Sequence, residues 1–187
     1  MKEALKNLTK DMWNVPNALT IMRIILIPVY LILFNMGLDK WALAVFLIAS
    51  FTDYLDGYIA RKNGLITNFG KLMDPLADKI MVLTVLITLT LRGWANPWLV
   101  GIVLFKELLM VCGALLLLRG EKVIASKMAG KAATVAFMLA IVLTFFHPEF
   151  TAWGFQLDFW VLLAAVALSL CALCVYARAA YKLKKSK

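Results

Sequence analysis

The sequence predicts an all-α protein that crosses a membrane six times, and composition and apolar spacing carry that prediction. Of its 187 residues, 63% are hydrophobic and 17% are charged, and the mean hydropathy is +0.85. A soluble domain is only about half apolar. The apolar residues gather in blocks of about twenty, which as helices cross a hydrocarbon core of roughly 30 Å. The six blocks cover residues 17–36, 41–60, 69–91, 97–118, 130–146 and 157–177, and we expect a single domain over residues 1–187.

The N-terminal stretch KEALKNLTKDMWNVPN is too charged to span a membrane. Its apolar residues Leu5, Leu8 and Met12 recur at helical spacing, while lysines occupy the positions between them. Such a pattern is typical of a helix that lies on the membrane surface. We therefore expect a short amphipathic surface helix before the first span.

The positive charges predict the topology. All but three of the 20 Lys and Arg residues lie at one set of block ends, the exceptions being Lys40, Arg92 and Lys106. Cytoplasmic segments carry such an excess, so both termini should be cytoplasmic, with the protein in a cell membrane. Anionic lipid explains the net charge of +9 without a nucleic-acid partner. An aromatic belt is expected at the opposite ends, formed by Trp41, Trp94, Trp98, Trp153 and Trp160.

One stretch, DYLDGYIARKNGLITNFGKLMDPLADK from residue 53 to residue 79, gathers four aspartates in an otherwise apolar chain. Asp53 and Asp56 share one helical face at the end of the second block. Asp74 and Asp78 share a face at the start of the third. Because the two helices are joined by a short connection, we expect all four carboxylates to converge near the cytoplasmic surface.

Converging carboxylates need compensating cations. Each aspartate facing lipid at mid-membrane would cost about 2.5–3.5 kcal/mol, so a lipid-facing arrangement is excluded. Oxygen-only ligands favour Mg²⁺ or Mn²⁺, and two such ions would neutralise four carboxylates and clamp a diphosphate. Gly57 and Ala60 leave room for a nucleotide diphosphate on the same face, and Arg61 can bind its phosphate oxygens.

The spacing D-x2-D-G-x2-A-R-x8-G-x3-D-x3-D, complete here from Asp53 to Asp78, resembles the signature of the CDP-alcohol phosphotransferases (the CDP-alcohol phosphatidyltransferase family). The resemblance implies a six-helix membrane enzyme, usually a homodimer. Such an enzyme moves a phosphatidyl group from CDP-diacylglycerol to an alcohol and releases CMP. It further implies roles for individual residues: metal ligation by Asp53, Asp56, Asp74 and Asp78, general-base catalysis by Asp78, and CDP binding by Gly57, Ala60 and Arg61.

The acceptor alcohol is less strongly indicated. The opening NVPNALTIMRIILIP is most similar to phosphatidylglycerophosphate synthases of bacterial membranes, whose acceptor is glycerol 3-phosphate. Arg119, Lys127 and Lys131 would then hold the acceptor phosphate. Those synthases have Arg-Glu in the fourth helix, where this chain has Lys106-Glu107. The segment GALLLLRG resembles cardiolipin synthases instead, whose acceptor is phosphatidylglycerol.

Other readings explain less of the sequence. An ion or proton transporter would also place acids in the membrane, but it would spread them through its depth rather than at one level. The Cys171–Cys174 pair lacks further metal ligands nearby, so we expect two buried small hydrophobes. His147, beside Pro148 at an outer helix end, suggests no role.

Overall fold

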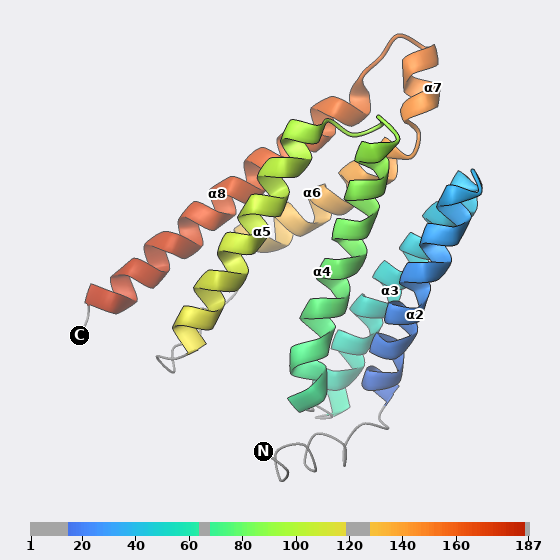
Figure 1. Ribbon diagram of the computed structural model, residues 1–187. Coiled ribbons are helices and arrows are strands. Elements are labelled where there is room, and N and C mark those ends of the chain that lie inside the picture. The colour runs from blue at the N-terminus through green and yellow to red at the C-terminus, as the bar shows by residue number, and fades with distance from the viewer. Residues whose placement is uncertain (1–14, 64–67, 119–127, 186–187) are drawn as a thin grey trace. The chain divides into compact units, whose positions relative to one another are not determined.

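The computed structural model describes residues 15–63, 68–118 and 128–185, and within these ranges it contains helices and no strand (Figure 1). The all-α fold is therefore confirmed, and six helices follow the six predicted blocks. The predicted N-terminal surface helix lies outside the described residues. The helices are α2 (Val15–Asn35), α3 (Asp39–Asn63), α4 (Asn68–Leu91), α5 (Pro97–Leu118), α6 (Met128–Thr144), α7 (His147–Ala152) and α8 (Leu157–Lys185).

The contacts between helices divide the chain into two compact units, Met1–Thr88 and Leu89–Lys187. The first contains α2, α3 and almost all of α4, and the second contains the remaining helices. Within each unit the helices contact one another. This division does not test the prediction of a single domain, which stays a prediction.

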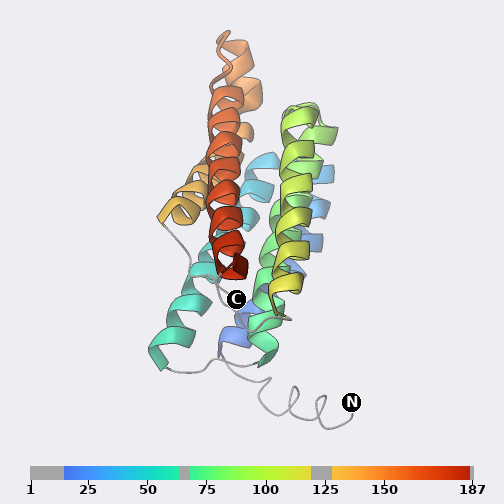
Figure 2. The same cartoon turned by 90° about the vertical axis from the view of Figure 1, so that its left-hand side faces the viewer.

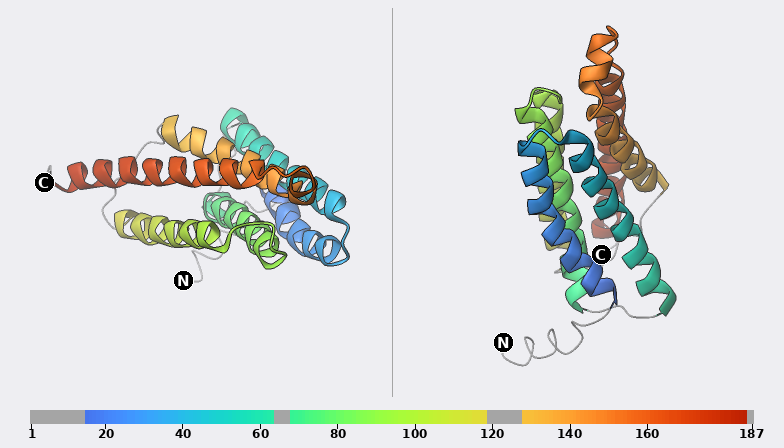
Figure 3. Two further views of the ribbon diagram at one scale, coloured as in Figure 1. Left: turned by 90° about the horizontal axis from the view of Figure 1, so that it is seen from above. Right: turned by 90° about the vertical axis from the view of Figure 1, so that its right-hand side faces the viewer.

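In the first unit, α2 packs against α3, and hydrogen bonds join α2 to α4 (Figure 3, right). One face of α2 is fully buried and carries Tyr30 and Phe34, whose rings stack 5.6 Å apart. The Tyr30 hydroxyl lies 2.7 Å from Oγ1 of Thr88 on α4. These contacts fix α2 as the helix that touches both of its neighbours.

Glycine and asparagine end and begin the helices. Gly37 adopts a φ of +76° after α2, a left-handed conformation that favours glycine. The following N–H, of Leu38, donates to the carbonyl of Leu33 and so satisfies the end of the helix. At the start of α5, Oδ1 of Asn96 accepts the N–H of Trp98 at 2.9 Å, an N-cap that precedes the proline at the first turn.

In the second unit, α6 and α8 pack closely (Figure 2). Their buried faces carry small residues, including Ala133 and Ala140 on α6 and Ala165 and Ser169 on α8. Small side chains let helix backbones approach each other, which is how helices associate in membranes. Cys171 and Cys174 are exposed on α8, so the expectation that they are buried is wrong: they lie off the packed face of this helix.

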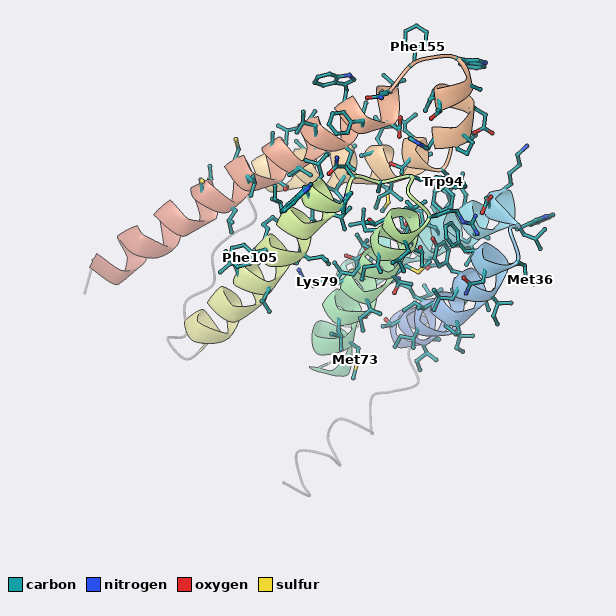
Figure 4. All side chains as sticks on the ribbon, turned by 45° about the horizontal axis from the view of Figure 1, so that its top comes forward. Met36, Met73, Lys79, Trp94, Phe105 and Phe155 are labelled. Atoms are coloured by element: carbon teal, nitrogen blue, oxygen red, sulfur yellow. The ribbon has the colours of Figure 1, made fainter. Side chains whose placement is uncertain are left out.

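The helix surfaces are apolar, as expected for contact with lipid. Ile25 and Ile32 on α2 and Leu168 on α8 are exposed, and Phe155 projects outward beside α8 (Figure 4). A soluble protein would rarely expose so much apolar surface. Four of the five belt tryptophans are also exposed, namely Trp41, Trp98, Trp153 and Trp160.

Among the residues that the structure describes, two segments are long and apolar enough to cross a membrane, Ala18–Asn35 and Leu157–Val175, and 22% and 33% of their residues are buried. They are therefore unlike the core helix of a soluble protein. Ala132–Thr144 is apolar but shorter. Charged residues interrupt the apolar runs of α3, α4 and α5, such as Asp53, Asp74 and Lys106. The described helices are consistent with a membrane protein, and the number of six spans stays a prediction.

The short helix α7 was not predicted, and it gives His147 a role. Nδ1 of His147 lies 2.6 Å from Oδ2 of Asp158, which is buried in the first turn of α8. Because an ionised carboxylate can only accept, Nδ1–H is the donor. Nε2 lies 3.3 Å from the hydroxyl of Thr151, so both ring nitrogens have partners. The imidazole therefore joins α7 to α8.

Removing this imidazole should destabilise the second unit. In His147→Ala the buried carboxylate of Asp158 loses its partner, which should lower the free energy of unfolding by about 1–3 kcal/mol. Thermal unfolding of the purified protein in detergent should show a melting temperature several degrees lower. Glu149→Ala, on the exposed side of the same helix, serves as the control. Equal melting temperatures for the two variants would contradict the assigned role.

Candidate functional site

Acidic and polar side chains lie toward one end of the first unit, where α2 begins, α3 ends and α4 begins. Asp53 lies in α3, and Asp74 and Asp78 lie in the first turns of α4. Met73, the neighbour of Asp74, marks this level in Figure 4, with Lys79 further along the helix. The three carboxylates are half-buried, so they line the end of the unit rather than its core.

The hydroxyl of Thr20 on α2 donates a hydrogen bond to Oδ1 of Asp74. Thr20 is fully buried and Asp74 is half-buried, so the bond is partly buried. The two residues are 54 positions apart in sequence. The bond orients one oxygen of the carboxylate toward α2.

The guanidinium of Arg23, three residues further along α2, reaches α3. Its Nη1 lies 3.0 Å from Oδ1 of Asp53, and its Nε donates to the carbonyl oxygen of Ala49 at 3.3 Å. The contact with Asp53 is an ion pair rather than a well-aligned hydrogen bond. Only the planar, forked guanidinium can reach both acceptors at once.

Arg23 is 1% exposed, while the side chain of Asp53 is 40% exposed. A charged arginine in an apolar helix costs about 2.5–3.5 kcal/mol at mid-membrane by insertion measurements, and such residues mark functional sites. The Asp53 carboxylate supplies the opposing charge. Asp53, the partner of the buried Arg23, is therefore partly accessible to solvent.

Asp53 and Asp74 come from different helices, and α2 contacts both of them. Asp53 already faces Arg23, and Asp74 already faces Thr20. One guanidinium offsets the charge of one carboxylate only. The pair therefore offers a net negative site made of oxygen atoms, which suits a hard divalent cation.

The other residues expected at this site are described in part. Asp56, Gly57, Ala60 and Arg61 continue the helix α3, but their side chains lie outside the described residues. Among the side chains that the structure does describe, no three His, Cys, Asp or Glu residues form a group able to hold a metal ion. The predicted four-carboxylate site stays a prediction, with Asp53 and Asp74 as its described pair.

The basic residues proposed for the acceptor cannot be placed. Arg119 and Lys127 fall outside the described residues, and so does the side chain of Lys131. In the second unit, Lys106 and Glu107 pair with each other at 2.6 Å. The two charges of this sequence departure therefore offset one another within α5.

Thr20 and Arg23 were not among the predicted site residues. Both lie in the segment NVPNALTIMRIILIP, which was used only as a resemblance. A signal was available, because Arg23 is a basic residue within an apolar block and Thr20 lies one helical turn before it. Their partners on α3 and α4 could not be read from local spacing.

Comparison with known proteins identifies the family of this chain. Residues 13–171 match the family model for CDP-alcohol phosphatidyltransferase. One relative is the CDP-diacylglycerol–glycerol-3-phosphate 3-phosphatidyltransferase of Bacillus subtilis (strain 168), 40% identical over 152 residues, which are 73% of this chain and 78% of that protein. The protein of the same name from Pseudomonas fluorescens is 35% identical over 182 residues, 90% of each chain.

A third relative has a different name. The cardiolipin synthase (CMP-forming) of Streptomyces coelicolor (strain ATCC BAA-471 / A3(2) / M145) is 31% identical over 173 residues, 81% of this chain and 80% of that protein. The family match, over residues 13–171, includes the carboxylate stretch. The chain belongs to the CDP-alcohol phosphatidyltransferase family.

Proposed function

We propose that this protein transfers the phosphatidyl group of CDP-diacylglycerol to glycerol 3-phosphate, forming phosphatidylglycerophosphate and releasing CMP. The observation that carries the proposal is the similarity to the Pseudomonas fluorescens enzyme, which extends over 90% of both chains. The complete aspartate motif, with Asp53 and Asp74 held by α2, supports a catalytic rather than a decayed site.

The donor set fits two Mg²⁺ or Mn²⁺ ions. Asp53, Asp56, Asp74 and Asp78 would hold them, all through oxygen atoms. When bound, such ions supply charge neutralisation to the diphosphate and to the leaving CMP. Gly57 and Ala60 give the CDP group space beside α3, and Arg61 binds its phosphate oxygens.

Asp78 is the proposed general base. It lies one helical turn after Asp74, so both side chains face the same side of α4. Asp78 takes the proton from the 1-hydroxyl of glycerol 3-phosphate, whose oxygen then attacks the β-phosphorus of CDP-diacylglycerol. The new P–O bond forms as the bond between the β-phosphorus and the CMP oxygen breaks.

The acceptor phosphate is proposed to bind Arg119, Lys127 and Lys131. These residues lie in the basic stretch between α5 and α6, which charge placement assigns to the cytoplasmic side. Glycerol 3-phosphate is a soluble dianion and reaches the membrane from that side. The same charge placement favours a cytoplasmic location for both termini and a position of the carboxylates at the cytoplasmic face. Family resemblance favours a homodimer in a bacterial cell membrane.

A second candidate function is supported by the cardiolipin synthase relative at 31% identity. That reaction would use the same carboxylates and the same CDP-diacylglycerol, with phosphatidylglycerol as the acceptor. Glycerol 3-phosphate is favoured because two relatives with the higher identities carry the name of that enzyme.

Turnover should depend on the carboxylates and on a divalent cation. Asp53→Asn and Asp74→Asn should each abolish CMP release, because each removes a charged ligand. Asp39→Asn, at the opposite end of α3, should leave it near the wild-type rate. Chelator should stop the reaction, and Mg²⁺ or Mn²⁺ should restore it. Full turnover in excess chelator would refute the metal hypothesis.

Asp78→Asn should separate catalysis from binding. Loss of a general base should lower kcat by about 10²–10⁴-fold, while CDP-diacylglycerol binding stays close to wild type. The measurement is steady-state CMP release together with direct titration of CDP-diacylglycerol. A parallel loss of kcat and binding would instead identify Asp78 as a metal ligand only.

The acceptor site should show in the Michaelis constants. Each of Arg119→Ala, Lys127→Ala and Lys131→Ala removes one charge-assisted contact and should raise KM for glycerol 3-phosphate about ten- to a hundred-fold. KM for CDP-diacylglycerol should barely change, and Lys40→Ala should have no effect on either. CMP release with phosphatidylglycerol but not with glycerol 3-phosphate would establish the second candidate function.

A further inference from the structure

We propose that Thr20 and Arg23 of α2 are positioning residues, which hold Asp74 and Asp53 so that each carboxylate presents its second oxygen to a divalent cation. The inference rests on the metal chemistry proposed above. It gives a role in metal binding to α2, a helix that contains none of the four aspartates.

The inference rests on the fact that one oxygen of each carboxylate already contacts a side chain of α2. Oδ1 of Asp74 accepts the hydroxyl of Thr20, and Oδ1 of Asp53 lies 3.0 Å from Nη1 of Arg23. A carboxylate held through one oxygen can bind a metal through the other, as a monodentate ligand. Asp53 and Asp74 would then approach an ion from α3 and α4 with their directions set by α2.

Burial indicates that these contacts are rigid. Thr20 is 0% exposed and Arg23 is 1% exposed, and their spacing of three residues places them on one face of α2. The same face carries Tyr30, which bonds to α4 near the other end of the unit. Two side-chain contacts, Thr20 with Asp74 and Tyr30 with Thr88, therefore join α2 to α4.

The guanidinium of Arg23 has a second anchor. Its Nε donates to the carbonyl of Ala49, which also accepts the hydroxyl of Thr52. The side chain is therefore tied to the backbone of α3 one turn before Asp53. A lysine would keep the charge but could not hold both acceptors in this way.

Partners that orient metal ligands have a measurable effect on metal affinity. Their substitution lowers affinity about ten- to a hundred-fold in known sites. Thr20→Val should therefore raise the dissociation constant for Mn²⁺ by roughly that factor. Thr20→Ser, which keeps the hydroxyl, should restore binding close to wild type. Arg23→Lys, which keeps the charge but loses the forked geometry, should also weaken Mn²⁺ binding.

The chain offers a matched control. Thr88→Val makes the same substitution on the same pair of helices, since it removes the contact between Thr88 and Tyr30. It lies away from the carboxylates, so it should change thermal stability and leave Mn²⁺ binding as in the wild type. A purely structural role for Thr20 would make the two variants behave alike.

The experiment titrates full-length purified protein in detergent with Mn²⁺ alone and follows the paramagnetic resonance of the unbound ion. Weaker binding in Thr20→Val, with wild-type binding in Thr88→Val and Thr20→Ser, supports the inference. Equal Mn²⁺ affinity in Thr20→Val and wild type overturns it, even if the wild-type enzyme remains active. Failure of the proposed function is distinguished by CMP release, which this titration does not use.

Discussion

The structure depends on how charged groups are held inside an apolar bundle. Arg23 is buried and faces Asp53 at 3.0 Å, and Thr20 faces Asp74. Each contact gives a charged group a partner, and a charge without a partner in an apolar surrounding is costly. The first helix therefore couples two helices that bring carboxylates together. The negative charges of Asp53 and Asp74 are stabilised because the guanidinium of Arg23 and the hydroxyl of Thr20, both on α2, face them.

The rest of the first unit maintains this arrangement. Tyr30 and Thr88 join α2 to α4 at the end far from the carboxylates, and Gly37 turns the chain so that α3 returns antiparallel beside α2. Apolar side chains on the outer surfaces need lipid around them. In the proposed membrane location, lipid would exclude water from the helices, and a charged substrate would meet the protein at the half-buried carboxylate end.

Much of the fold was predictable because apolar blocks, proline and glycine mark helix ends, as at Gly37 and Pro97. The aspartates of the site were predictable from helical spacing. The short helix α7 was not, since it has six residues and no apolar block. Thr20 and Arg23 were missed for another reason: their partners lie on other helices, and only packing in three dimensions brings them together. The acceptor residues depend on a stretch outside the described structure, so their proposed role still rests on sequence.

The most direct test is a structure of the full-length protein with Mn²⁺ bound, in which anomalous scattering locates the ion. The account predicts that Asp53 and Asp74 each bind an ion through the oxygen that does not contact α2. Thr20 and Arg23 should still hold the two Oδ1 atoms. An ion bound elsewhere, or one that takes both oxygens of either carboxylate after displacing Thr20 or Arg23, would contradict it.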